Sequence, residues 1–468
     1  MRKVVLEGGR RLTKDDLNRS GALPAEVIAS AEAIVNEVRA RGDEAVREYC
    51  MRFDGACPAS FRVPNELVQG ALELVDPSFL QALTRARDHI RDFHEREREQ
   101  SWFTTRSDGT LLGVQVTPVA SAAVYVPGGR AQYPSTVLMD TIPAKVAGVK
   151  RVVMLTPPQH DGTLSAYTLA AAALAGVDEV YAVGGAQAIG AAAYGTESIP
   201  AVDKIVGPGN AYVAAAKRYV SGDVGIDMVA GPSEVCVLAD ATADPVVVAA
   251  DLMAQAEHDP LASCYLVTCE PELPDKVLAA AERLLAQSPR EEITRASLDN
   301  RGVIVVADTL DGAIDAVNVV APEHLELHCA DAMSLVGRIH NAGAIFVGAW
   351  SSEPLGDYVA GPNHTLPTGG TARFSNPLGV YDFQKRSSVI RYTPEGLLSD
   401  ADSVQTIAQS EGLWAHALSV GLRRRLAEQD REQYDDETLA CEGAYRVAWP
   451  QDLPETPGVT LPGFEKKA

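Results

Sequence analysis

Four short segments of the sequence carry side chains that could perform acid–base or metal chemistry. They contain five of the nine histidines. An imidazole changes its charge near neutral pH, so it suits proton transfer, and it is also a common metal ligand. The segments are DLMAQAEHDP with Gln255 and His258, APEHLELH with Glu323 and His324, GDYVAGPNH with Asp357 and His364, and EGLWAH with Glu411 and His416.

The first segment is predicted to close a helix. Asp244 is a good N-cap, and Pro245 suits the first helical position. Gln255 then continues an apolar stripe at helical spacing, His258 follows about one turn later, and an Asp-Pro pair ends the helix. Two donors on one face suit a metal ion, but two ligands do not make a site. The alternative is a hydrogen-bonded core glutamine beside a surface histidine.

The other segments have similar alternatives. Adjacent Glu323 and His324 place a carboxylate and an imidazole at one turn of the chain, or else begin an exposed helix. Asp357 lies in a glycine-punctuated loop and could be a simple turn residue. Glu411 and His416 could form a polar helix face. Taken together, Gln255, His258, Asp357 and His416 would be a nitrogen and oxygen donor set without thiolate. That composition suits a catalytic zinc that leaves room for substrate.

Composition limits the class of protein. The chain has 468 residues, enough for two or three domains, and a net charge of −22, which argues against nucleic acid and anionic membranes as partners. Seven scattered cysteines without CxxC spacing predict free thiols in a reducing compartment. The N-terminus does not resemble a signal peptide, and no apolar run reaches membrane-spanning length. We therefore expect a cytoplasmic enzyme.

The chain alternates between β-rich runs and Ala-rich helices from about residue 121, which predicts mainly parallel sheets covered by helices. The fold class is α/β, with two related doubly wound, incomplete Rossmann-like domains, a helical N-terminal region and a small C-terminal helical arm. The expected divisions are 1–120 (helical), 121–233 (nucleotide-binding α/β domain), 234–380 (second α/β domain with the metal and catalytic residues), 381–425 (arm) and 426–468 (Pro- and charge-rich extension, partly disordered).

Four turns in residues 121–233, VPGG, TPPQ, VGGAQ and VGPGN, follow predicted strands. Ligands of open α/β sheets bind beyond the carboxyl ends of strands, and glycine lets the backbone approach them. Tyr125, Gln187 and Asn210 lie at or beside these turns and could hold parts of a nucleotide. The dinucleotide fingerprint G-x-G-x-x-G is absent, so these glycines could also serve only the turns.

Longer motifs carry a family resemblance over about residues 10–425. They include YVPGGRAQYPSTVLM, VGGAQAIGAAAYG, DKIVGPGNAYVAAAKR, IDMVAGPSE, DLMAQAEHDPLA, APEHLEL, EPLGDYVAGPNHTLPTGGTARFSNPLGVYDFQKRSS and EGLWAHA. In this order they resemble the histidinol dehydrogenase family. The resemblance implies oxidation of L-histidinol through L-histidinal to L-histidine with two NAD in succession. It also implies a zinc ion that orients the substrate and a homodimer with a shared active site.

The resemblance assigns roles residue by residue. Glu323 would activate water and His324 would accept the alcohol proton. Tyr125, Gln187 and Asn210 match NAD contacts. Gln255, His258 and Asp357 match zinc ligands of one subunit, and His416 matches the ligand given by the partner. The positions expected around the substrate are Ser135, Ser233, Gln255, His258, His324, Glu353, Asp357, His364, Glu411 and His416.

Two departures from the family pattern stand out. Asp140 occupies a position where the family often has Asn, and residues 426–468 have no counterpart. Three alternative functions stay open at this point. One is a paralogue that oxidises another small alcohol, such as a sulfonated diol; the others are a zinc hydrolase and a non-catalytic α/β binding protein.

Overall fold

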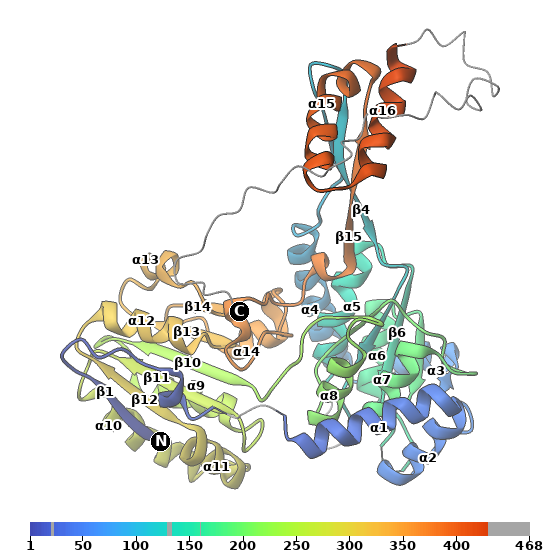
Figure 1. The fold of residues 1–468 in the computed structure, drawn as a ribbon. Helices are drawn as coiled ribbons and strands as arrows, with labels where there is room; N and C mark the ends of the chain where they lie inside the picture. Colours follow the sequence, from blue (N-terminus) through green and yellow to red (C-terminus); the bar gives the residue numbers. More distant parts are fainter. Residues whose placement is uncertain (20–22, 129–132, 160, 429–468) are drawn as a thin grey trace, which may run out of the picture. The chain divides into compact units, whose positions relative to one another are not determined.

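The computed structural model describes residues 1–19, 23–128, 133–159 and 161–428 (Figure 1). Most of the predicted extension, from residue 429, lies outside these described residues, as do residues 129–132 of the YVPGGRAQYPSTVLM motif. The chain divides into two units. The larger contains Met1–Arg98 and Pro118–Lys385, and the smaller contains Glu99–Thr117 and the chain from Arg386. The larger unit holds the two α/β sheets, so it is the unit that positions most of the candidate site.

The first sheet, called sheet 1, has the order β2-β7-β6-β5-β8-β9. All its neighbours are parallel except the short edge strand β2 (Arg62–Val63), which is antiparallel to β7. Apolar side chains from helices cover both faces of the sheet. The other strands are β5 (Ser121–Tyr125), β6 (Arg151–Thr156), β7 (Glu179–Ala182), β8 (Lys204–Val206) and β9 (Gly225–Ile226), and the helices that follow four of them are α5 (Pro134–Ala147), α6 (Ala166–Ala175), α7 (Gly185–Tyr194) and α8 (Ala211–Val220).

The second sheet, called sheet 2, has the order β1-β12-β11-β10-β13-β14 and is parallel throughout. Its last five strands repeat the order of the corresponding strands of sheet 1, which confirms the prediction of two related, mainly parallel sheets. Its strands are β1 (Arg2–Leu6), β10 (Glu234–Ala239), β11 (Ser263–Thr268), β12 (Val303–Ala307), β13 (His324–His328) and β14 (Ala344–Val347). Its main helices are α9 (Pro245–Ala256), α10 (Leu273–Leu285), α11 (Glu291–Arg301) and α12 (Leu310–Val320), and short α13 (Ala332–Leu335) follows β13.

Residues 1–120 are only partly helical. Helices α1 (Ala25–Arg41), α2 (Asp43–Phe53), α3 (Asn65–Leu74) and α4 (Pro77–Glu95) form as predicted and pack on sheet 1. The five-residue β1 instead joins the edge of sheet 2, and β3 (Trp102–Thr105) pairs with β4 (Leu111–Pro118). The helical interpretation was incomplete because the hydrogen bonds of β1 go to β12, about three hundred residues away, which no local pattern reveals.

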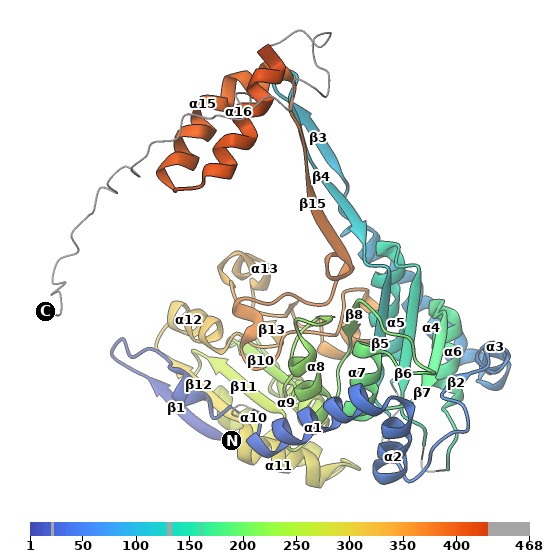
Figure 2. The same ribbon diagram turned by 45° about the vertical axis from the view of Figure 1, so that its right-hand side comes forward.

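The smaller unit contains β3, most of β4 and β15 (Gln384–Arg391), and the helices α15 (Pro394–Ser410) and α16 (Trp414–Glu428). Figure 2 shows the narrow sheet β15-β4-β3 and the two helices packed side by side. The predicted C-terminal helical arm contains this pair of helices. Among the described residues, no helix combines the length and apolar character needed to span a membrane.

Candidate active site

Helix α9 presents Gln255 to the interior of the larger unit. The Asp244 side chain accepts a hydrogen bond from the Val246 N–H at 2.8 Å, and Pro245 is the first helical residue, as predicted. Gln255 is completely buried, one turn after buried Asp251. The helix ends at Ala256, so His258 lies just beyond it and is exposed. Desolvation lowers the pKa of His258 even so, which favours the neutral imidazole that binds metals.

Glu323 and His324 open a buried strand rather than an exposed helix. His324 is the first residue of β13, and both side chains are buried among the surrounding segments. A Glu323 carboxylate oxygen accepts the backbone N–H of Glu234 at 2.8 Å, which fixes the carboxylate against β10. Because side chains alternate along a strand, His324 and His328 share one face of β13. The alternative of an exposed helix start is therefore wrong.

The third segment brings Asp357 to the same place. Asp357 lies in the π-helical turn Gly356–Ala360, which follows α14 (Glu353–Leu355), so the expected loop is a helical turn. Single π-helical turns often occur at functional sites. His364 contacts the backbone oxygen of Asp357 through Nδ1 at 3.0 Å and the Thr136 hydroxyl through Nε2 at 3.2 Å. This histidine links the turn to α5.

These segments converge on His324. Its Nδ1–H donates to Gln255 Oε1 at 3.1 Å, and its Nε2 lies 3.3 Å from Asp357 Oδ1. Ligand atoms of His324, Glu353 and Asp357 all lie within 4.8 Å of one another. The structure thus brings residues expected to bind metal and residues expected to do catalysis into one buried cluster, which we call the catalytic cluster: Gln255, Glu323, His324, Glu353 and Asp357.

Several buried polar atoms of the catalytic cluster make no hydrogen bond among the described residues. They are Gln255 Nε2, Glu353 Oε2 and His324 Nε2, of which the last still lies within ion-pair distance of Asp357. An unpaired buried polar group costs about 1–3 kcal/mol, so proteins keep such groups mainly where function uses them. The donor types are amide, imidazole and carboxylate, and His258 is near enough for the charge of Asp357 to act on its pKa. A donor set of this kind, with no thiolate, is typical of a catalytic zinc site, in which one ligand position is kept for water or substrate.

Burial sets the protonation of the cluster. It raises the pKa of Glu323 to about 7 and that of Glu353 to about 8. Burial opposes the charged form of His324, but the carboxylates of Glu323 and Asp357 outweigh it and raise its pKa to about 10. Burial also disfavours the charged Asp357, yet its contacts with His324 keep the pKa lowered. Groups with such displaced pKa values in one cluster are typical of acid–base sites.

A cavity of about 1050 Å³ adjoins the end of α9. Ser135 at the start of α5 and His258 both line it, beside Tyr133, Arg290 and Tyr358. A cavity of this size accommodates a small molecule or a nucleotide. Ser233 is half-buried and directly precedes β10, and its backbone oxygen accepts the Ser263 N–H at 3.0 Å.

The three expected nucleotide contacts lie at the carboxyl ends of sheet 1. The Tyr125 hydroxyl accepts the Gly185 N–H at 3.0 Å, so two neighbouring turns are joined. Gln187 is buried and its Oε1 has no hydrogen-bond partner among the described residues. Asn210 Oδ1 caps α8 by accepting the N–H groups of residues 212 and 213. A side chain on Gly207, whose φ is +108°, would collide with the Tyr125 carbonyl.

Glu411 and His416 belong to the smaller unit. Glu411 is the C-cap of α15 and His416 lies in the first turn of α16; both are exposed. Their expected roles, as a substrate contact and a ligand given to a partner subunit, stay predictions.

Asp140 is completely buried on α5. Its Oδ1 accepts the Thr365 hydroxyl at 2.7 Å, while Oδ2 lies next to Gly207 without a hydrogen-bond partner among the described residues. Asp140 therefore lies between the segment of His364 and a turn of the nucleotide side. Burial raises its pKa to about 8.

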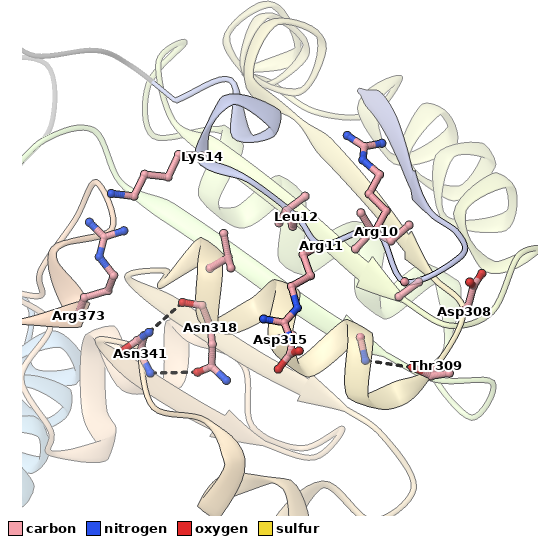
Figure 3. Close-up of a pocket in the computed structure, with 15 residues that line it drawn as sticks. Arg10, Arg11, Leu12, Lys14, Asp308, Thr309, Asp315, Asn318, Asn341 and Arg373 are labelled. Atoms are coloured by element: carbon pink, nitrogen blue, oxygen red, sulfur yellow. Dashed lines mark hydrogen bonds between the residues drawn. The ribbon is translucent and has the colours of Figure 1, made fainter.

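A second cavity, of about 830 Å³, lies at the carboxyl ends of β1 and β12 (Figure 3). Lys14 and Arg373 extend toward the same space there, and both are exposed. Asn318 and Asn341 line it too, but they hydrogen-bond to each other. The sequence did not predict this cavity.

Two sheets of one topology and a buried cluster of amide, imidazole and carboxylate groups define an α/β enzyme with a candidate metal centre. Comparison with known proteins makes the assignment specific. The chain belongs to the histidinol dehydrogenase family, whose model matches residues 17–424.

Individual relatives agree with the family match. The histidinol dehydrogenase of Bacillus licheniformis is 52% identical over 396 residues, which cover 85% of this chain and 93% of the relative. That of Bacillus subtilis is 51% identical over 91% of this chain and 99% of its own length. The crystal structure of histidinol dehydrogenase from Elizabethkingia anophelis is similar at a TM-score of 0.86 and 34% identity, covering 92% of this chain and 99% of that chain.

Proposed function

We propose that the chain is an NAD- and zinc-dependent dehydrogenase that oxidises L-histidinol through L-histidinal to L-histidine. The observation that carries the proposal is the convergence of Gln255 and Asp357 on His324, within a chain of this family. The hydrolase and the non-catalytic binding protein are not favoured, because relatives named histidinol dehydrogenase are about half identical over nearly their full length. The six described cysteines are free thiols, which fits a cytoplasmic location.

The first oxidation needs a base for the alcohol proton. As the hydroxyl-bearing carbon gives a hydride to NAD, His324 takes the hydroxyl proton and the aldehyde forms. This role requires the neutral ring. The pKa of about 10 belongs to a ring whose Nε2 faces the free Asp357 carboxylate, and zinc held by Asp357 would withdraw that carboxylate and lower the pKa of His324. Gln255 holds Nδ1 of the ring at 3.1 Å, which leaves Nε2 as the atom directed toward Asp357 and the reacting groups. A positioned base of this kind contributes about 10²–10⁴-fold to the rate.

The second oxidation needs a water molecule. Glu323 accepts a proton from water as the water oxygen adds to the aldehyde carbon. The hydrate then gives its hydride to a second NAD, and the product is the carboxylic acid. With its pKa near 7, Glu323 can both accept and return a proton at neutral pH. Its hydrogen bond from the Glu234 N–H holds the carboxylate in place between steps.

Zinc would be held by Gln255, His258 and Asp357, with His416 of the partner subunit as a further ligand. When bound, zinc would orient the amine and imidazole nitrogens of the substrate. Ser135, Ser233, Glu353, His364 and Glu411 would surround the substrate. NAD would lie at the carboxyl ends of sheet 1, against Tyr125, Gln187 and Asn210. This arrangement requires a homodimer with a shared active site.

The test is spectrophotometric. Purified protein with L-histidinol and NAD should form two NADH for each histidinol consumed; a chelator should abolish the reaction and zinc should restore it. A paralogue would form NADH only with another alcohol, such as a sulfonated diol. A hydrolase would form none with any alcohol. Mixing His416→Ala subunits with His258→Ala subunits should restore activity if each site takes its ligand from two chains.

A further inference from the structure

We infer that Asp251, Glu326 and His328 are positioning residues, which hold the three segments of the catalytic cluster in register. The inference rests on the proposed function for its activity assay, but its geometry stands independently. None of the three is among the residues assigned above to catalysis, zinc, NAD or substrate. We call them the positioning triad.

The positioning triad is a closed, buried contact network. His328 Nε2 lies 3.2 Å from Asp251 Oδ2 and 3.3 Å from Glu326 Oε2. All three residues are buried, Glu326 completely so. Burial disfavours the charged imidazole, but the two carboxylates outweigh it and raise the pKa of His328 to about 9. The imidazolium therefore offsets charge that would otherwise be buried without a partner.

Each triad member is linked to a member of the catalytic cluster through the backbone. Asp251 precedes Gln255 by one turn of α9, so both lie on the same helix face. His328 and Glu326 share a face of β13 with His324. Thus α9 contacts β13 twice, by Gln255 with His324 and by Asp251 with His328. Two contacts separated along the helix fix the direction of its axis and its register against β13, which one contact cannot do.

The third link runs to the segment of Glu353 and Asp357. Glu326 Oε1 accepts the backbone N–H of Glu353 at 2.7 Å, at the first residue of α14. Four residues later the chain reaches Asp357 in the π-helical turn. Glu326 therefore uses one oxygen for this segment and the other for His328. Loss of His328 would leave two buried carboxylates facing one another, and we expect them to separate and displace α9 and α14.

The experiment compares His328→Leu with His328→Gln in the full-length protein. Leucine removes the donor between the carboxylates, whereas glutamine keeps an N–H donor. Residues that support metal ligands typically change metal affinity or activity by about 10–100-fold. We expect His328→Leu to lower kcat/KM for L-histidinol about tenfold or more, mainly through kcat, and to lose zinc at about tenfold lower chelator concentration. His328→Gln should stay within about threefold of the parent on both measures.

A matched control lies at the other end of sheet 2. Asp240 follows β10 and accepts the Ala330 N–H at 2.8 Å, a carboxylate-to-backbone contact of the same kind as that of Glu326. Asp240→Asn should leave kcat/KM and zinc retention within about twofold of the parent. Glu326→Gln keeps the side-chain shape and serves if His328→Leu fails to fold; it should also weaken zinc retention.

The outcomes separate this inference from the proposed function. If the parent protein forms NADH from L-histidinol and both His328→Leu and Glu326→Gln match it in rate and zinc retention, the positioning role is wrong. If Asp240→Asn loses zinc as easily as His328→Leu, the effect is general destabilisation and the inference also fails. If the parent forms no NADH, the proposed function fails, while zinc retention by the same variants still tests the positioning triad.

Discussion

The two ends of sheet 2 differ in the kind of polar group they present. At the amino ends, His324 contacts Gln255 of α9 and Glu323 contacts the first residue of β10, in a buried cluster with atoms that have no hydrogen-bond partner among the described residues. At the carboxyl ends, a cavity of about 830 Å³ is lined by the exposed cations Lys14 and Arg373 and by two asparagines that hydrogen-bond to each other. In open α/β sheets, ligands usually bind beyond the carboxyl ends of the strands. In this chain, buried polar atoms that have no hydrogen-bond partner among the described residues mark the opposite end.

Sheet 1 has its expected ligand site at the carboxyl ends of its strands, and this explains why the site of sheet 2 lies at the amino ends. The expected nucleotide contacts lie at its carboxyl ends, at the turns after β5, β7 and β8. A hydride must pass between a nucleotide and a substrate in contact. The residues of sheet 2 that bind the substrate therefore need to face the carboxyl ends of sheet 1. In the proposed function, these residues lie at the amino ends of sheet 2.

The largest expected effect is at the amino ends. His324→Ala should lower kcat by about 100-fold or more, because a positioned base contributes about that much. Steady-state NADH formation with L-histidinol measures it, and circular dichroism checks the fold. Activity near that of the parent would show that His324 is not the catalytic base, and the amino ends of sheet 2 would then not be distinguished by catalysis.

Glu323→Gln should separate the two oxidations. An amide cannot take a proton from water, so the variant should slow hydration of the aldehyde more than oxidation of the alcohol. We expect close to one NADH per histidinol in a single turnover, against two for the parent. Supplying L-histidinal directly should give a loss of about 100-fold or more in rate. Two NADH formed at the parent rate would contradict the role of Glu323.

Asp357→Asn should lower zinc affinity by at least about tenfold, since an amide is a weaker ligand than a carboxylate and the charge is lost. Metal content after dialysis against a graded chelator series measures this. Asp308→Asn is the control, because Asp308 is an aspartate of the carboxyl-end cavity. Equal loss of zinc in both variants would contradict the assignment of the metal centre to the amino ends.

Asp140 tests whether a buried carboxylate outside the catalytic cluster affects stability. Its Oδ2 is buried and has no hydrogen-bond partner among the described residues. Burial raises its pKa from the ordinary 3.8 of an aspartate to about 8 in the folded chain. The folded state therefore binds the proton more tightly, and stability falls as the pH rises through this window. Between pH 5 and 8 the parent should lose up to about 4 kcal/mol relative to Asp140→Asn. Urea unfolding at both pH values measures this; parallel pH dependence would contradict it.

The smallest effect should come from the carboxyl-end cavity. Lys14→Ala combined with Arg373→Ala removes two exposed cations that have no assigned role. Surface substitutions of this kind change stability by at most about 0.5 kcal/mol. Thermal unfolding, kcat and KM should all match the parent. A clear loss of activity would show that this end of sheet 2 also serves the reaction.

Local patterns were enough for most of the elements after residue 120 and for singling out most residues of the candidate site. The cap and proline at Asp244 and Pro245 located α9, and strand–helix alternation led to both sheets. The motifs around Gln255, Glu323 and Asp357 were found because each carries its reactive residue beside glycine, proline or a second polar group. The resemblance then supplied roles that spacing left open.

Only the tertiary structure decided which distant groups meet. The pairing of β1 with β12, the strand at His324 and the contact of Asp251 with His328 all depend on partners far along the chain. HLELH alternates as a strand does, but five residues are too few to exclude a helix. Periodicity reports one face of one element, whereas packing determines what that face touches. For this reason the chemistry could be named from the sequence, while its place at the amino ends of sheet 2 could not.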